Sequence, residues 1–176
     1  MTTRATVAAP PSVMPAILTF CQWLERTSVG SGVRESLWLF PAIETAHLFG
    51  IILLVSATVA FDLRLLSLAL REQAVSKLAS RLLPWAWVGF AVQVLTGALL
   101  FASEATKCYG NPAFRIKMLL LALAGMNALV FHAASFRSVA AWDNISDPPP
   151  GAKCAAALSI LLWFGIVAAG RWIGFT

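Results

Sequence analysis

Four long runs of apolar residues, each interrupted by only a few polar side chains, occupy most of the chain. A helix needs about 20 apolar residues to cross the hydrocarbon core of a bilayer, and each run is near that length. The pattern therefore predicts an all-α fold, an integral membrane bundle of four transmembrane helices. The expected spans are about 37–61, 84–102, 113–135 and 155–173.

A shorter amphipathic segment precedes the first run. In residues 16–27, apolar side chains recur at helical spacing, and polar side chains lie between them. The segment is too short and too polar to span, so it predicts a helix that lies in the membrane interface. The sequence Ser-Val-Gly-Ser-Gly, which starts at Ser28, is expected to end this helix. The apolar positions are Ile17, Cys21 and Leu24, and the polar ones are Gln22, Glu25 and Arg26.

A second amphipathic segment leads into the second run. Val75, Leu78 and Leu82 fall on one helix face among basic residues. This pattern fits either another interfacial helix or a solvated connector. Residues 103–112 read as a loop with a Gly-Asn-Pro turn. Residues 1–15 are small, polar and Pro-rich and predict a disordered tail, which leaves 16–176 as a single membrane domain.

Composition supports the membrane interpretation. Hydrophobic residues make up 59% of the 176 residues and charged residues only 12%. Soluble domains average about 25% charged residues, so this chain has too few charges to coat a water-facing surface. The net charge of +5 comes from basic residues beside the apolar runs, which favours contact with the lipid bilayer over nucleic acid. The basic residues divide almost evenly between the two sides, so they assign no orientation.

Cysteine spacing predicts free thiols. Cys21, Cys108 and Cys154 are far apart and form no CxxC pair. A metal cage or a disulfide framework is therefore not expected.

The two histidines, His47 and His132, both fall inside apolar runs. An ionisable residue within the membrane is costly and is a candidate functional group by default. Neutral imidazole is also a common axial ligand of haem iron, and helix bundles hold cofactors between facing helices. The alternative is that each histidine only hydrogen-bonds a neighbouring helix.

Glu44 lies three residues before His47, so the two share a helix face. A carboxylate beside a histidine can orient its ring, as it does for metal-bound imidazole. The alternative is an ion pair between Glu44 and Lys117 or Arg171 on the same side of the membrane. We call this side, which carries the N-terminal segment, face A.

Basic residues also gather near face A, where they could hold an acidic headgroup or the propionates of a haem. Each of them could instead extend to the interface without a ligand. The mid-span amides Gln93 and Asn127 are expected to hydrogen-bond neighbouring helices. Gly89 and Gly97, spaced with Gln93 at every fourth residue, are expected to let helices approach closely. The basic set is Arg34, Arg115, Lys117 and Arg171.

The chain contains the runs RESLWLFPAIETAHLFGIILLV, FDLRLL, RLLPWAWVGF, TGALLFASEATKCYGNPAFRIK, NALVFH and AGRWI. These runs resemble a family of small bacterial membrane proteins with no assigned function, which implies a bacterial inner-membrane location. They also resemble, more distantly, the membrane domains of copper-resistance D-type proteins and HemJ-type protoporphyrinogen oxidases. In the HemJ type, the corresponding helical histidine is associated with b-type haem and basic residues with the tetrapyrrole. The shared features map onto His47, the end of the first span at 62–66, Thr96-Gly97 and Lys117.

The resemblance and the buried polar residues together predict binding of haem b or another tetrapyrrole, with His47 as the ligand to the haem iron. The expected partner is a redox or other membrane protein. The alternative is a non-enzymatic metal-handling component or a structural subunit of a membrane complex. Whether the chain is an enzyme is left open.

Depth separates the two histidines. A rise of 1.5 Å per residue places His47 about 15 Å from face A and His132 about 28 Å from it. Two ligands of one iron each lie about 2 Å from the metal, so the two histidines are not expected to share one. Met126, at about 20 Å, is expected to be a better-placed second ligand.

Overall fold

The structure, a computed structural model, describes residues 13–143 and 147–175. The regular elements in these residues are helices. The predicted tail lies outside the described residues as far as residue 12. The elements are α1 (Val13–Glu25), α2 (Ser28–Glu35), α3 (Leu39–Leu65), α4 (Val75–Ser103), α5 (Ala105–Gly110), α6 (Pro112–Ala134), the 3-10 helix η1 (Phe136–Ala141), α7 (Pro150–Trp172) and the 3-10 helix η2 (Ile173–Phe175).

Four of these helices, α3, α4, α6 and α7, are long and apolar enough to cross a membrane. Large apolar side chains point outward along them, including Phe49 (67% exposed), Leu129 (69%) and Phe164 (76%). Such surfaces suit a lipid environment, because exposing them to water would be unfavourable. The predicted all-α membrane bundle is therefore confirmed.

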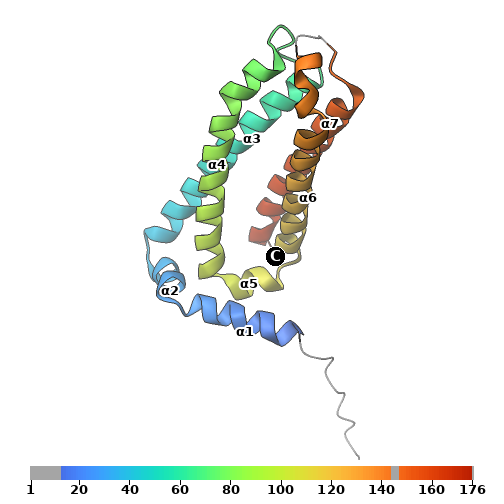
Figure 1. Cartoon of the computed structure of the whole chain (residues 1–176). Coiled ribbons are helices and arrows are strands. Elements are labelled where there is room, and N and C mark those ends of the chain that lie inside the picture. The colour runs from blue at the N-terminus through green and yellow to red at the C-terminus, as the bar shows by residue number, and fades with distance from the viewer. Residues whose placement is uncertain (1–12, 144–146, 176) are drawn as a thin grey trace, which may run out of the picture.

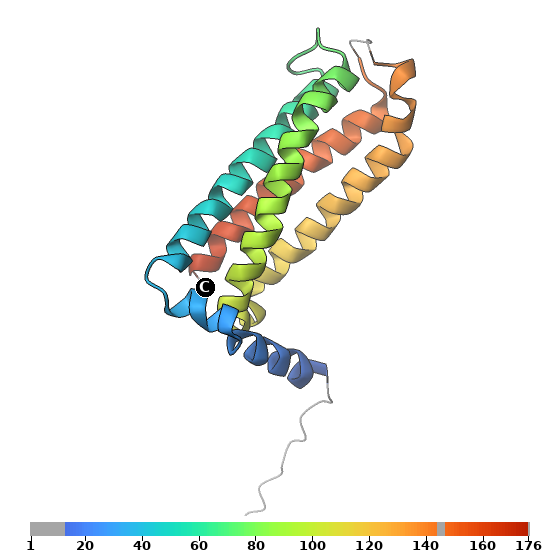
Figure 2. The same ribbon diagram turned by 60° about the vertical axis from the view of Figure 1, so that its left-hand side comes forward.

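The long helices form two hairpins, α3 with α4 and α6 with α7 (Figure 1). The two hairpins contact each other through α3 and α7. They also meet at the end of the bundle that is distant from α1, which we call face B. There Leu65, Val75, Trp142, Ala152 and Ala156 form a buried cluster. Turning the molecule shows α7 passing between α3 and α6 (Figure 2). At face A, the short helices α1, α2 and α5 cover the ends of the long helices (Figure 1).

The second amphipathic segment is neither an interfacial helix nor a connector. It forms the first turns of α4, which continues through Pro84 as one helix. Val75 and Leu78 are both buried, and Val75 holds the segment on the face-B cluster, of which it is a member. At 29 residues, α4 is about 43 Å long, more than the roughly 30 Å hydrocarbon core. Its charged first turns therefore extend beyond the hydrocarbon at face B.

At face A, two further segments differ from what the sequence predicts. The Ser-Val-Gly-Ser-Gly sequence begins a second short helix, α2, because the Thr27 side chain accepts a hydrogen bond from the Gly30 backbone N–H (3.2 Å) and caps it. A Cβ atom at Gly30 would lie 2.6 Å from the Leu24 carbonyl oxygen, so only glycine fits there. The expected loop 103–112 also contains a helix, α5.

Four spans place both ends of the chain on one side of the membrane. Reporters fused before Thr3 and after Thr176 should therefore give the same localisation signal, while one inserted between α3 and α4, at Glu72, should give the opposite signal. The measurement is paired alkaline phosphatase and green fluorescent protein activity in cells. Opposite signals from the two ends would contradict an even number of spans.

Candidate functional site

The imidazole of His47 is held by α4. Its Nδ1 lies 2.8 Å from Oγ1 of Thr96, and the Thr96 hydroxyl donates its single hydrogen to the Val92 carbonyl (2.5 Å). Oγ1 must therefore accept from Nδ1–H, which leaves Nε2 without a proton. Within the described residues, Nε2 has no hydrogen-bond partner. This tautomer is the one that can bind a metal through Nε2.

Two more residues of α4 fix the position of His47. The Gln93 amide donates to the His47 backbone carbonyl (2.6 Å), as expected for a mid-span amide. A Cβ atom at Gly97 would lie 3.3 Å from Cε1 of the imidazole, so glycine gives the ring its space. Asn127 has a similar role elsewhere, because its amide donates to the Ala155 carbonyl (2.9 Å). In the sequence, the Thr96-Gly97 pair was the signal that α4 supports the His47 ring. Spacing alone did not identify Thr96 as the hydrogen-bond partner of His47.

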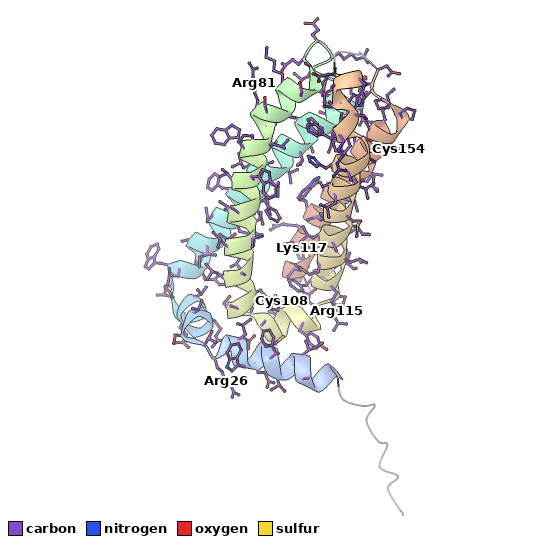
Figure 3. The ribbon with its side chains drawn as sticks, in the orientation of Figure 1. Arg26, Arg81, Cys108, Arg115, Lys117 and Cys154 are labelled. Atoms are coloured by element: carbon purple, nitrogen blue, oxygen red, sulfur yellow. The ribbon has the colours of Figure 1, made fainter. Side chains whose placement is uncertain are left out.

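Lys117 extends from α6 over a glycine of α7. Its Nζ lies 3.7 Å from where a Cβ atom of Gly170 would be. The ammonium and the His47 ring are close enough to interact electrostatically. In residues 13–143 and 147–175, Lys117 forms no ion pair and no hydrogen bond. Figure 3 shows it on the stretch of α6 nearest α5, near Cys108. A half-buried cation without an anionic partner is costly within a membrane.

Glu44 is exposed and, among the described residues, pairs with neither Lys117 nor Arg171. It is also not the partner of the His47 Nδ1, which is Thr96. Eighteen residues, or five turns, separate Glu44 from Asp62, so both lie on one face of α3. The Asp62 carboxyl interacts with the Ser159 hydroxyl of α7. Glu44 therefore lies on the α7 side of α3.

The remaining basic residues do not converge with Lys117. Arg34 is 3.9 Å from Glu35 and donates to the Ser103 carbonyl (3.5 Å). Arg115 donates to the Tyr109 carbonyl, and the Arg171 guanidinium lies 5.9 Å from the centre of the Phe175 ring.

Met126 is 61% exposed and nine residues from Lys117. Nine residues are two and a half turns, so Met126 lies on the opposite face of α6. The structure does not bring Met126 together with His47.

The two histidines lie near opposite ends of the bundle. His47 is in the third turn of α3 from face A, whereas His132 is in the last turn of α6, near face B, and stacks on Phe136 with ring centres 5.2 Å apart. The expected separation in depth therefore appears in the structure.

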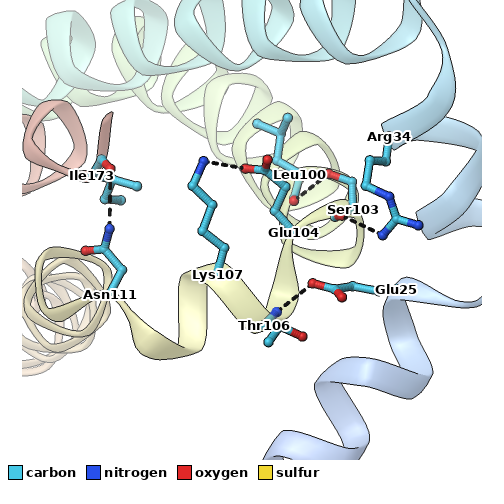
Figure 4. A network of polar contacts seen from close by, with 9 residues as sticks. All are labelled: Glu25, Arg34, Leu100, Ser103, Glu104, Thr106, Lys107, Asn111 and Ile173. Atoms are coloured by element: carbon cyan, nitrogen blue, oxygen red, sulfur yellow. Dashed lines mark hydrogen bonds and ion pairs between the residues drawn. The ribbon is translucent and has the colours of Figure 1, made fainter. Parts of the chain in front are cut away.

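A polar network at face A fixes the helix ends near the candidate site (Figure 4). Glu25 of α1 accepts from the Thr106 backbone N–H (2.7 Å), and Lys107 pairs with Glu104 (3.5 Å). Asn111 caps α6 and donates to the Ile173 carbonyl (3.3 Å), which joins α6 to the end of α7. These contacts hold the end of α6 that carries Lys117.

The three cysteines are free thiols, as expected. Burial and the nearby Glu104 carboxylate raise the pKa of the Cys108 thiol, which therefore stays protonated near neutral pH. In the described part of the chain, no group of three His, Cys, Asp or Glu side chains could hold a metal ion. A copper site built from such a group is accordingly absent from these residues.

Asp62 was not singled out as a candidate from the sequence. It is 6% exposed, and its Oδ2 has no hydrogen-bond partner among the described residues. The neighbouring Arg64, 1% exposed, donates from Nε to the Gln73 carbonyl (2.7 Å) and so anchors the α3–α4 turn. The DLRLL sequence at the end of a span was the available signal for this buried pair of residues.

Comparison with known proteins gives one result. Neither the curated proteins nor the solved structures contain a match to the chain. A family model described as a family of unknown function (DUF6644) matches residues 20–176, which is nearly the whole chain. The chain therefore belongs to the DUF6644 family.

Proposed function

We propose that this protein binds haem b, or a related tetrapyrrole, between its two hairpins in the bacterial inner membrane and serves electron transfer with a membrane partner. In this proposal the His47 Nε2 is the axial ligand to the iron. Lys117 pairs with a propionate, and Glu44 borders the site at face A. The bound haem would supply the one-electron chemistry.

The observation that carries the proposal is the hydrogen bond from His47 to Thr96. A structural histidine in a membrane helix would be expected to use both ring nitrogens, because an unpaired polar atom is costly there. Here Thr96 fixes Nδ1–H and leaves the lone pair of Nε2 unused by the described residues. Metal-bound histidines are commonly oriented in this way, with the second nitrogen donating to a neighbouring oxygen.

Lys117 also favours haem as the bound molecule. Its ammonium lies near the imidazole but has no carboxylate partner in the described part of the chain. A haem carries two propionates, and one of them would neutralise this charge. A neutral ligand would leave the free-energy cost of this half-buried cation uncompensated. Since Met126 lies on the far face of α6, the proposal has a single protein ligand to the iron, His47.

The first test is the absorption spectrum of the full-length protein, expressed with haem supplied and purified in mild detergent. The expected result is a Soret band that shifts on reduction, with the α and β bands of a b-type haem. Pyridine extraction measures haem per chain. Absence of haem from protein that is folded by thermal melting would end the proposal and leave a structural or metal-handling role.

We expect Lys117→Met to weaken haem retention about tenfold. Hydrogen bonds to charged groups contribute about 1.5 kcal/mol or more, and 1.4 kcal/mol corresponds to a factor of ten. Lys107→Met is the matched control, because Lys107 is 64% exposed and already pairs with Glu104. The measurement is transfer of haem to apomyoglobin over time. Equal loss rates in the two variants would exclude a propionate contact at Lys117.

A further inference from the structure

A second candidate site lies at face A, on the outside of the bundle. It is an apolar groove of about 410 Å³ between α1, α5 and the ends of α4 and α6. Its walls include Ile17, Phe20, Phe101, Phe114 and Met118, and the rings of Phe101 and Phe114 stack at 5.6 Å. Several of these side chains remain uncovered: Ile17 is 44% exposed, Phe20 54% and Met118 49%.

The groove extends from the membrane interface into the hydrocarbon. Phe101 lies two residues before the end of α4, and Phe114 lies two residues after the start of α6. Met118 is one turn further along α6, about 9 Å from its first residue. The amphipathic helix α1 lies alongside and carries the exposed Trp23. A ligand here would have its polar end at headgroup level and an apolar part in the groove.

Arg115 stands at the groove with an uncompensated charge. Its Nε and Nη2 both donate to the Tyr109 carbonyl (3.0 and 2.8 Å), and its guanidinium lies 5.2 Å from the centre of the Tyr109 ring. These contacts fix the side chain. They leave Nη1 without a partner in the described residues, and no carboxylate there forms an ion pair with Arg115. A fixed guanidinium with free donors suits a phosphate.

From this combination we infer that the groove binds one anionic phospholipid, with an acyl chain against Phe101 and Phe114 and the headgroup phosphate on Arg115. Charge complementarity selects this occupant over a neutral isoprenoid quinone, which would fill the apolar groove but would leave the guanidinium unneutralised. The site is distinct from His47 and Lys117, so it does not depend on haem binding.

The test uses the full-length protein in phosphatidylcholine nanodiscs that contain trace spin-labelled phosphatidylglycerol or spin-labelled phosphatidylcholine. Electron spin resonance measures the immobilised fraction of each label. The wild type should favour phosphatidylglycerol about fivefold, because one basic residue near a lipid headgroup contributes about a factor of five. This preference should fall in high salt.

Three substitutions in the groove and one control test the inference. Arg115→Gln should abolish the preference, and Arg115→Lys should keep part of it because the charge remains. Arg81→Gln should leave it unchanged, since Arg81 is an exposed arginine at the other end of the bundle (Figure 3). Met118→Trp, which fills the groove, should reduce immobilisation of both lipids.

Three results would overturn the inference: no preference in the wild type, equal losses in Arg115→Gln and Arg81→Gln, or displacement of phosphatidylglycerol by added ubiquinone independently of Arg115. The last result would identify the groove as a quinone site. If Arg115→Gln does not fold, the wild-type preference and its salt dependence decide the question.

Discussion

Gly89→Ala is expected to destabilise the protein by about 3 kcal/mol, although alanine is the better helix former. A Cβ atom at Gly89 would lie 2.7 Å from the Leu54 backbone nitrogen and 3.0 Å from the Leu54 Cα. A side chain could turn away from such a contact, but a helix backbone cannot. The two helices of the first hairpin would have to separate, and overpacking of this kind costs about 1–3 kcal/mol or more.

Gly125→Ala is the matched control. A Cβ atom there meets nothing within 4 Å, so alanine should be neutral or stabilising, since glycine costs up to about 1 kcal/mol in a helix. Thermal melting in detergent, followed by size-exclusion fluorescence, should show Gly89→Ala melting about 6–12 °C lower than the wild type. Equal melting temperatures for the two variants would show that α3 and α4 do not pack at Gly89 as described.

The spans could be predicted because the length of an apolar run carries most of the information. Lipid requires about 20 apolar residues per crossing, and the charged residues at Asp62, Arg64 and Arg137 marked where the first and third runs end. The length of an apolar run does not show where a helix begins if its first turns are polar and lie beyond the hydrocarbon. The first turns of α4 are such a case, because Val75 is buried in a cluster with Trp142 and Ala152, more than 60 positions away. Periodicity does not reveal contacts of this kind.

The candidate site was predictable only in part. The depth of a residue along its span follows from sequence, so His47 and Lys117 could both be assigned to the face-A side. Which side of a helix faces which neighbour depends on how the hairpins pack. That information was missing for Met126, which has a suitable depth but the wrong helix face, and for Thr96, 49 positions from His47 along the chain.

Replacing His47 with alanine should remove the Soret band of the purified protein almost completely. In the proposed site the iron would lose its one protein ligand, and the remaining apolar and ionic contacts would hold the haem weakly. His132→Ala should keep most of the band, because His132 lies near face B and stacks on Phe136. Both variants remove one imidazole from a membrane helix, so the comparison separates ligation from general loss of a histidine.

Thr96→Val tests the mechanism behind this difference. Valine has the shape of threonine but cannot accept the hydrogen bond from Nδ1, so the ring would be free to rotate and to change its tautomer. Loss of such a supporting contact typically weakens metal binding 10- to 100-fold, and we expect haem affinity to fall within that range. The Soret band should remain visible when haem is in excess.

Added imidazole provides a further test of whether His47 ligates the iron. Added imidazole should restore the Soret band of His47→Ala, because a free imidazole can occupy the space beside Gly97 that the side chain has vacated. It should have no such effect on Lys117→Met, in which the iron ligand is intact. Equal loss of the band in His47→Ala and His132→Ala, with both proteins melting like the wild type, would refute ligation by His47 alone. Failure of imidazole to restore the band would indicate instead that His47 acts by shaping the site, and the ligand would then have to be sought on another helix.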